Sequence, residues 1–213
     1  MEFRQGTIED LDHICCLIES AIKRMEAQGI HQWDEVYPSR EDFVHDIING
    51  ILYTVTENNR LIAIYVISTE YDPQYSNGKW ECDGETACII HRLCVAPEVQ
   101  NRGIGKMLLN HIENQLRNNS FESVRLDVFS ENPHAVSLYE KSGYVRRGHA
   151  DWRKGRFWLM EKKLQAISAG TSPISCWRKG KNSLCFLYAS KISENENCYK
   201  CPFLYQIVSG LIF

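Results

Sequence analysis

The sequence predicts an α/β protein with a mixed β-sheet. Segments with helical and strand periodicity follow one another in the order strand, two helices, three strands, helix, strand, helix, two strands. The apolar run LIAIYVI at 61–67 is typical of a strand buried on both faces. A glycine-containing stretch, VQNRGIGKML at 99–108, joins a strand pattern to a helix pattern. Together these observations favour helices packed on a sheet over a repeat array.

Polar start signals define the helices of the first half of the chain. Thr7 and Asp10 have the spacing of a capping box, and Ser39 is a second N-cap residue. Asn58 and Asn59 predict a tight turn between two strand patterns. In order, we expect a strand at 2–5, helices at 7–29 and 39–50, and strands at 51–57 and 60–68.

The second half of the chain alternates strands with two helices. The segment SVRLDVF places Val124, Leu126 and Val128 on one face of a strand. Asn132 and Pro133 begin a helix that ends before Gly143. In order, we expect a loop at 71–85, a strand at 86–95, a helix to about 119, a strand at 123–129, a helix at 134–143, and strands at 144–148 and 157–164.

The composition is that of an ordinary globular protein. The chain has 213 residues, 44% hydrophobic and 24% charged, with a formal net charge of -3. That charge gives no reason to expect a nucleic-acid partner, and no run of 18 apolar residues predicts a membrane span. The first residues do not have the pattern of a secretory signal. We therefore expect most of the nine cysteines to be reduced thiols in the cytoplasm.

A boundary is expected between residues 165 and 166. Residues 1–165 hold 19 Lys and Arg against 25 Asp and Glu, whereas residues 166–213 hold 5 against 2. The net charge thus changes from -6 to +3 at a stretch of small residues ending in Pro173. We expect a C-terminal extension of unknown role, with a zinc site as the alternative reading of its cysteines, which are Cys176, Cys185, Cys198 and Cys201.

The stretch at 99–108 is not one of the familiar nucleotide loops. A Walker-type loop needs a glycine where Gln100 stands and a Ser or Thr where Met107 stands. A dinucleotide fingerprint needs a third glycine where Leu108 stands. Unpaired N–H groups at the start of the following helix would still attract phosphate oxygens.

From about residue 2 to 164 the chain resembles the GNAT N-acetyltransferase superfamily. Residues 100–105, QNRGIG, fit its Q/R-x-x-G-x-G/A motif and follow a strand ending in LCVAP at 93–97. Asn132 and the run LYEKSGY at 138–144 look like its closing motif. The resemblance implies a mostly antiparallel central sheet with a splayed parallel pair, and helices on both faces, within a domain at 1–165.

The resemblance also implies acetyl-CoA as co-substrate, with no metal. The backbone N–H groups of the loop would bind the pyrophosphate, because Gly103 and Gly105 have no Cβ to hold it away. The exposed edge of the strand at Leu93, Cys94 and Val95 would pair with pantetheine. One of the N–H groups of this edge would polarise the thioester carbonyl. Asn132 would cap a helix and bond the cofactor. The expected cofactor-binding residues are Leu93, Cys94, Val95, Gln100, Asn101, Arg102, Gly103, Ile104, Gly105, Lys106, Asn132 and Tyr139. The alternative to a pyrophosphate-binding loop is a tight turn without a ligand. The alternative to a pantetheine-binding edge is a continuous sheet in which these strand groups are paired.

Tyr139 and His91 are the expected catalytic residues. The resemblance implies that Tyr139 protonates the departing thiolate, a transfer expected to run downhill because the phenol pKa of about 10 exceeds that of a thiol, near 8.5. His91, expected on one strand face with Leu93 and Val95, could accept the proton of the attacking amine. It could equally line the substrate pocket or only pack. The usual strand carboxylate is missing from residues 87–90, and Glu85 is a weaker alternative.

The acceptor pocket is expected in the loop after the first helix and in the loop at 71–85. Trp33 and Tyr37, with Asp34 and Glu35 between them, would suit a cationic amine, although they could equally cover the sheet edge. We expect acetyl-CoA and an amine as partners, without nucleic acid or membrane, and leave a homodimer open. A CoA-binding sensor that has lost catalysis is the alternative function.

Overall fold

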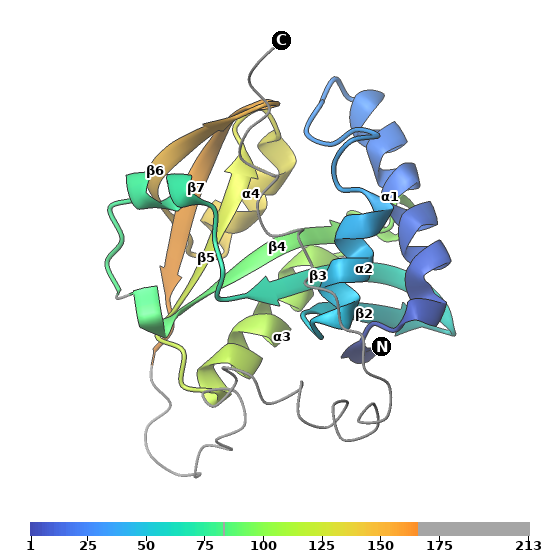
Figure 1. Cartoon of the computed structure of the whole chain (residues 1–213), viewed down its shortest axis with the longest axis horizontal. Coiled ribbons are helices and arrows are strands. Elements are labelled where there is room, and N and C mark those ends of the chain that lie inside the picture. The colour runs from blue at the N-terminus through green and yellow to red at the C-terminus, as the bar shows by residue number, and fades with distance from the viewer. Residues whose placement is uncertain (83, 166–213) are drawn as a thin grey trace, which may run out of the picture. The chain divides into compact units, whose positions relative to one another are not determined.

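The computed structural model describes residues 1–82 and 84–165 (Figure 1). The expected boundary at 165/166, the extension and its four cysteines lie outside the described residues. The strands are β1 (Glu2–Gln5), β2 (Leu52–Glu57), β3 (Arg60–Ser68), β4 (Ala87–Val95), β5 (Ser123–Phe129), β6 (Val145–Trp152) and β7 (Gly155–Lys163). The α-helices are α1 (Leu11–Glu26), α2 (Arg40–Ile48), α3 (Ile104–Asn118) and α4 (Pro133–Lys141).

Short 3-10 turns occupy the connections. They are η1 (Ile8–Asp10), η2 (Pro73–Asn77), η3 (Gly84–Thr86) and η4 (Pro97–Val99). The local start signals are confirmed: both Thr7 with Asp10 and Ser39 with Asp42 form capping boxes. Asn58 and Asn59 have φ of 51° and 59°, as a tight turn between β2 and β3 requires.

The seven strands form one mixed sheet in the order β1-β2-β3-β4-β5-β7-β6. Only β4 and β5 are parallel, and all other neighbours are antiparallel. The pairing of β4 with β5 runs from Ala87 with Ser123 to Ile90 with Leu126 and then stops. The predicted fold class, with its splayed parallel pair, is confirmed.

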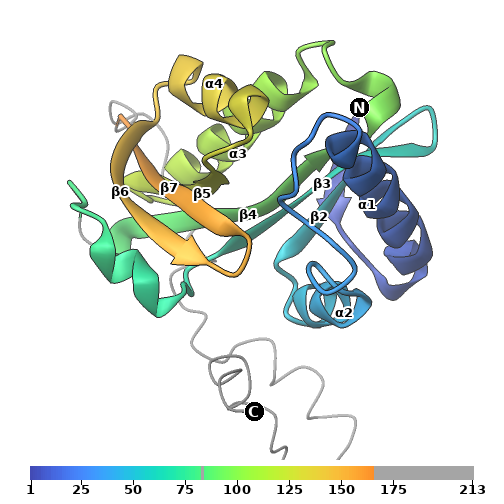
Figure 2. The same ribbon diagram turned by 90° about the horizontal axis from the view of Figure 1, so that it is seen from above.

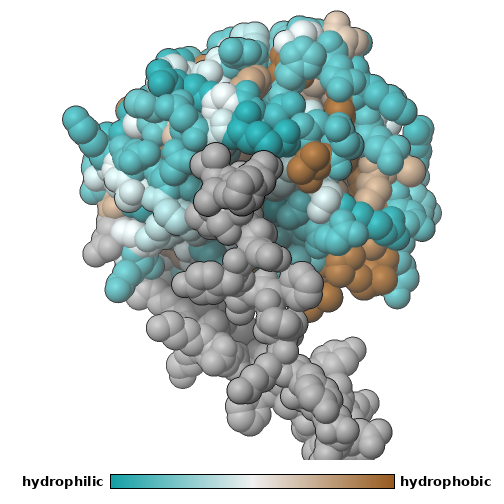
Figure 3. Space-filling view, turned by 45° about the horizontal axis from the view of Figure 1, so that its top comes forward, coloured by the Kyte–Doolittle hydropathy of each residue, from teal (hydrophilic) through white to brown (hydrophobic). Residues whose placement is uncertain are grey.

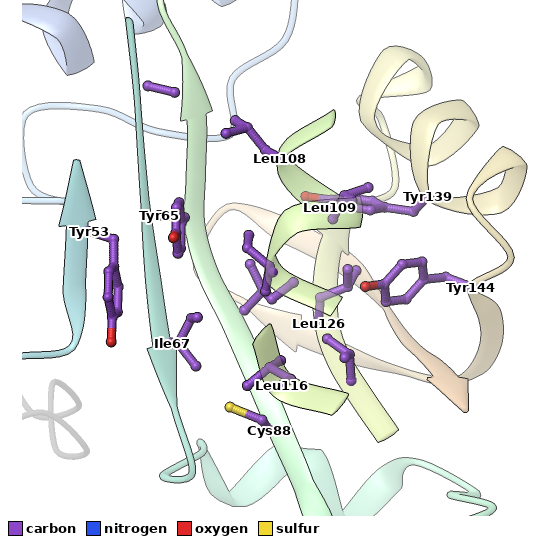
Figure 4. Close-up of a cluster of buried hydrophobic side chains, with 14 of the residues drawn as sticks. Tyr53, Tyr65, Ile67, Cys88, Leu108, Leu109, Leu116, Leu126, Tyr139 and Tyr144 are labelled. Carbon is purple, nitrogen blue, oxygen red and sulfur yellow. The ribbon is translucent and has the colours of Figure 1, made fainter. Parts of the chain in front are cut away.

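Helices cover both faces of the sheet (Figure 2). On one face α3 and α4 pack on the largest buried cluster, which includes Leu108, Leu126 and Tyr139 (Figure 4). On the other face α1 and α2 pack on a second cluster around Ile14, Phe43 and Ile64. The strand β3 is buried from Ile62 to Ile67 and contributes to both clusters, as its apolar run predicted.

A β-bulge at Arg92 changes the direction of side chains along β4. Arg92 has φ of 50°, and the pairing with β3 skips from Val66 opposite His91 to Ile64 opposite Cys94. Leu93 and Val95 therefore pack on the α3 side of the sheet, whereas the charge of Asp127, on the other side, acts on His91. The expectation that His91, Leu93 and Val95 share one face is wrong, because strict alternation ends at the bulge.

One face of the described part is largely polar (Figure 3). The face shown in Figure 3 is mostly hydrophilic, with apolar side chains in a few separate patches. Within residues 1–82 and 84–165, every helix is too short or too polar to cross a bilayer.

Candidate active site

The divergence of β4 from β5 creates an open strand edge at the centre of the sheet. Beyond Ile90, the β4 backbone has no partner in β5, so residues 91–95 present main-chain groups to the gap. Gln100 Nε2 donates to the carbonyl oxygen of Val95 at 2.9 Å and ties the following loop to this edge. An extended amide-containing chain can pair with such an edge as an added strand.

The loop that follows ends in the N-terminus of α3. Gly103 is the N-cap residue with φ of 76°, and Asn101 also has a left-handed φ, of 61°. Among the described residues, none accepts a hydrogen bond from the backbone N–H groups of residues 101–106. A Cβ built on Gly103 would meet no atom within 4 Å, so the space above it is open. Free N–H groups and a helix dipole favour the approach of an anion to this loop.

Gly105 has a second role in packing. A Cβ at this position would lie 3.0 Å from Leu138 Cδ2, so the missing side chain lets α3 approach α4. Of the two basic residues expected to help, Arg102 lies 3.5 Å from Glu57 and is more than half exposed. Gly103 is therefore the cleaner probe of the loop.

Asn132 is the N-cap of α4, as predicted. Its Oδ1 accepts from the Ala135 N–H at 3.0 Å, and its Nδ2 donates to Gln32 Oε1 at 3.0 Å. Both ends of the amide are thus engaged with described residues. The contact with Gln32 ties the loop between α1 and α2 to the start of α4.

Tyr139 extends from α4 toward the centre of the sheet (Figure 4). Its ring packs edge-on against Tyr144, with centroids 5.7 Å apart. Within the described part of the chain, no residue hydrogen-bonds its hydroxyl. Burial raises the pKa of Tyr139, and the charge of Asp127 raises it further. The phenol is therefore protonated at neutral pH and lies near the divergent ends of β4 and β5.

A carboxylate that the sequence reading missed lies at the same place. Asp127 on β5 accepts a 2.8 Å hydrogen bond from Tyr75 Oη of η2. Burial raises the pKa of Asp127, which the charge of His91 and the Tyr75 hydrogen bond oppose. Because Val124, Leu126 and Val128 alternate on one face, the sequence already placed Asp127 on the other. The sequence analysis looked for a carboxylate only on the strand that became β4, whereas Asp127 lies on the neighbouring strand β5.

His91 faces the same space from β4. Burial lowers the pKa of its imidazole, an effect that the charge of Asp127 partly opposes. A lowered pKa leaves the ring neutral at pH 7, in the form that accepts a proton. Glu85, the weaker alternative, belongs to η3 before the paired start of β4, at the other end of the strand from His91.

The bulge residue Arg92 anchors β4 to α2. Its guanidinium forms an ion pair with Asp46, which is 3% exposed, and lies 3.5 Å from Asp42. The same guanidinium lies over the Tyr37 ring, 5.2 Å from the centroid. Arg92 thus holds α2 and the loop before it against the strand that borders the gap.

The loop between α1 and α2 only partly matches its expected role. Trp33 packs on the cluster under α1 and α2, which supports the covering role. Asp34 accepts from Arg153 at 2.8 Å and from Lys154 at 3.1 Å, and these contacts lower its pKa. Asp34 therefore fixes the loop to the β6–β7 turn. Tyr37 is the residue of this loop that faces Arg92.

Comparisons with known proteins agree with this geometry. The chain belongs to the acetyltransferase (GNAT) family, whose sequence model matches residues 17–144. It is 32% identical over 163 residues to S-(2-succino)cysteine N-acetyltransferase of Bacillus subtilis (strain 168), covering 76% of this chain and 94% of that protein. The family assignment confirms the resemblance, and the name of this relative agrees with the N-acetyltransferase class that the resemblance implied.

Two further similarities have narrower scope. The chain is 31% identical over 70 residues to the [Ribosomal protein bS18]-alanine N-acetyltransferase of Salmonella typhimurium, covering 31% of this chain and 47% of that protein. The structure of PaiA N-acetyltransferase of Thermoplasma acidophilum in complex with coenzyme A has 22% identity and a TM-score of 0.59. This likeness covers 76% of this chain and 98% of that one. At this identity it supports the fold alone.

Proposed function

We propose that the chain is an acetyl-CoA-dependent N-acetyltransferase that transfers the acetyl group directly to a primary amine. The observation that carries this proposal is the gap between β4 and β5, which brings an open strand edge, Tyr139, His91 and Asp127 together. Family membership and a coenzyme A complex among the structural relatives support the choice of co-substrate. Five described cysteines, all free, support a cytoplasmic location.

Acetyl-CoA would be held by the backbone from both ends of the gap. The free N–H groups of residues 101–106 would bind the pyrophosphate, with Lys106 adding positive charge. The edge at residues 91–95 would pair with the pantetheine amides, and an N–H group of Leu93, Cys94 or Val95 would hold the oxyanion that forms on attack. Asn132 is already engaged with Ala135 and Gln32, so its proposed role is to shape the site.

In the chemical step, the amine nitrogen attacks the thioester carbon and forms the C–N bond. The tetrahedral intermediate collapses, the C–S bond breaks, and Tyr139 donates its proton to the sulfur. The nitrogen loses a proton as the amide forms, and this proton returns the Tyr139 phenolate to its neutral form. For the isolated groups this transfer is uphill, contrary to the sequence-based expectation, because a phenol of pKa 10 or more is a weaker acid than a thiol near 8.5. It becomes feasible where the thiolate is poorly solvated, because desolvation raises the basicity of an anion.

The ammonium form of the acceptor must first lose a proton. Asp127 is the leading base, because burial raises the pKa of its carboxylate and makes it a stronger base than an exposed one. His91, with its neutral imidazole, would pass the proton onward or act through a water molecule. The usual carboxylate is missing from residues 87–90, and that absence favoured a non-catalytic sensor. Asp127 would supply such a carboxylate from β5 instead.

A thiol-release assay tests the proposal. The full chain, acetyl-CoA and a panel of amines would be incubated, and both coenzyme A and the acetylated amine would be measured. The panel would include S-(2-succino)cysteine, a peptide with N-terminal alanine, and aliphatic diamines. We expect amine-dependent release with equimolar acetylated product. Tight acetyl-CoA binding without transfer to any amine would instead support a sensor.

A further inference from the structure

A buried ion pair that the mechanism above does not use fixes the loop between β3 and β4 to the sheet. Arg125 on β5 and Glu161 on β7 lie directly opposite each other. Arg125 Nε donates to Glu161 Oε1 at 3.1 Å, and the two side chains are 4% and 1% exposed. Withdrawing two charges from water is costly, and apolar residues of similar size often stabilise a fold as well. Stability alone is therefore a weak reason for this pair.

Both members of the pair bind the backbone of the loop. Glu161 Oε2 accepts from the Glu81 N–H at 2.7 Å, and Arg125 Nη2 donates to the carbonyl oxygen of Cys82 at 2.6 Å. The Arg125 guanidinium also lies over the Trp80 ring, 4.4 Å from the centroid. Arginine can make these contacts at once, because its planar group donates at its edge and stacks on its face. The pair therefore fixes the position of Trp80.

Trp80 in turn fixes Tyr75. Its Nε1 donates to the carbonyl oxygen of Tyr75 at 2.8 Å, and the two rings are stacked with centroids 5.7 Å apart. A Cβ on Gly78 would collide with the Trp80 indole, so the glycine leaves room for it. Tyr75 is 2% exposed, and its hydroxyl donates to Asp127. A continuous set of contacts thus runs from the buried ion pair to Asp127.

Groups from several elements act on the charge of Asp127. On its own strand, Arg125 is two residues away on the same face. The titratable and charged groups of other elements that interact electrostatically with Asp127 are His91, Arg92, Tyr37, Asp72, Tyr75 and Tyr139. Of these, Tyr75 donates a hydrogen bond to the carboxylate. Because a hydrogen bond to the charged form lowers a carboxyl pKa, displacing the Tyr75 hydroxyl would raise the pKa of Asp127.

We propose, given the N-acetyltransferase function above, that Arg125, Glu161 and Trp80 are positioning residues that hold the Tyr75 hydroxyl on Asp127. They act through Tyr75 and not on the substrate. Trp80 is uncharged, so it transmits position and not charge. The fixed hydroxyl keeps Asp127 ionised, and so able to accept the amine proton, to a lower pH than burial alone would allow.

The test titrates Asp127 in the full chain without acetyl-CoA or amine. The aspartate carboxyl carbons would be labelled with carbon-13 for NMR, and the Asp127 signal would be identified by its loss in Asp127→Asn. Trp80→Phe removes the donor to the Tyr75 carbonyl and changes no charge. It should raise the Asp127 pKa at least half as far as Tyr75→Phe does. In a Tyr75→Phe background it should add nothing, because both changes act through one contact.

Two further variants distinguish positioning from loss of packing. Trp152→Phe is the matched control, because Trp152 packs on the Tyr75 ring at 6.5 Å but the bond to the Tyr75 carbonyl comes from Trp80. The Asp127 pKa of this control should stay at its wild-type value. Arg125→Lys keeps the positive charge but loses the planar group over Trp80, so it should raise the Asp127 pKa as Trp80→Phe does.

The outcomes judge the positioning role and the proposed function separately. An Asp127 pKa that stays unchanged in folded Trp80→Phe or Arg125→Lys, or that rises as far in Trp152→Phe as in Trp80→Phe, would overturn this inference and leave the N-acetyltransferase function standing. In the transfer assay, the acid limb of kcat/KM should move with the pKa, while kcat on the alkaline plateau stays within threefold. Absence of transfer to any amine would overturn the proposed function, whereas the titration of the free chain tests the positioning by itself.

Discussion

The hydroxyl of Tyr75 donates a 2.8 Å hydrogen bond to Asp127 Oδ1 and so joins η2 to the open end of β5. The bond stabilises the charged form of a carboxylate whose pKa burial has raised. It therefore lowers the pH above which Asp127 is ionised and able to accept a proton. Two residues 52 positions apart in the sequence thus form the side of the gap where the proposed general base lies.

Removing this hydrogen bond should shift the pH profile. Tyr75→Phe leaves the Asp127 pKa higher, so the acid limb of kcat/KM should move toward higher pH, while kcat on the alkaline plateau changes little. Asp127→Asn should lower kcat by about 10² on the alkaline plateau, the usual scale for a lost general base, and should remove the acid limb. Tyr71→Phe is the control, because it removes a phenol hydroxyl from the same loop but leaves the hydrogen bond to Asp127 in place. The acid limb of this variant should stay at its wild-type pH. An unmoved limb in Tyr75→Phe would rule out Asp127 as the titrating base.

The loop before α3 offers a matched pair of glycines. Gly103 and Gly29 have φ of 76° and 74°, and a Cβ at either would meet nothing within 4 Å. Substitution by alanine therefore introduces similar backbone strain at both. Gly103→Ala should weaken acetyl-CoA binding at least tenfold, about 1.4 kcal/mol, because the new methyl group enters the phosphate space. Gly29→Ala should not. Equal acetyl-CoA affinities by calorimetry would contradict the assignment of this loop.

The buried ion pair between Arg92 and Asp46 should matter for stability. Asp46→Ala leaves Arg92 without its closest partner in a buried place and should lower the free energy of unfolding by about 3–5 kcal/mol. Asp12→Ala breaks an exposed pair with Arg40 and should cost about 1 kcal/mol or less. Urea denaturation measures both. Similar small losses would mean that the strand bulge does not depend on this contact.

Much of the fold follows from local sequence signals. Capping residues, Gly and Pro positions and the alternating run at 123–129 located each element to within a few residues. The predicted sheet face of the His91 side chain was wrong because of the bulge at Arg92. The bulge arises from the pairing of β4 with β3, and the hydrophobic periodicity around Arg92 does not indicate it. Asp127 was missed for a related reason: its partner Tyr75 is brought to it only by the tertiary fold. Asp34 is held by a distant hairpin turn, which the local sequence could not reveal.

The central claim is that Tyr139 completes acetyl transfer at the gap between β4 and β5. Tyr139→Phe removes one hydroxyl and little volume from a buried ring, so acetyl-CoA affinity should change by less than threefold. Single-turnover release of coenzyme A with a responsive amine should slow by about 10² or more, since the lost proton is needed only in the transition state. Single-turnover release within threefold of the wild-type rate would remove Tyr139 from the chemistry and contradict the account.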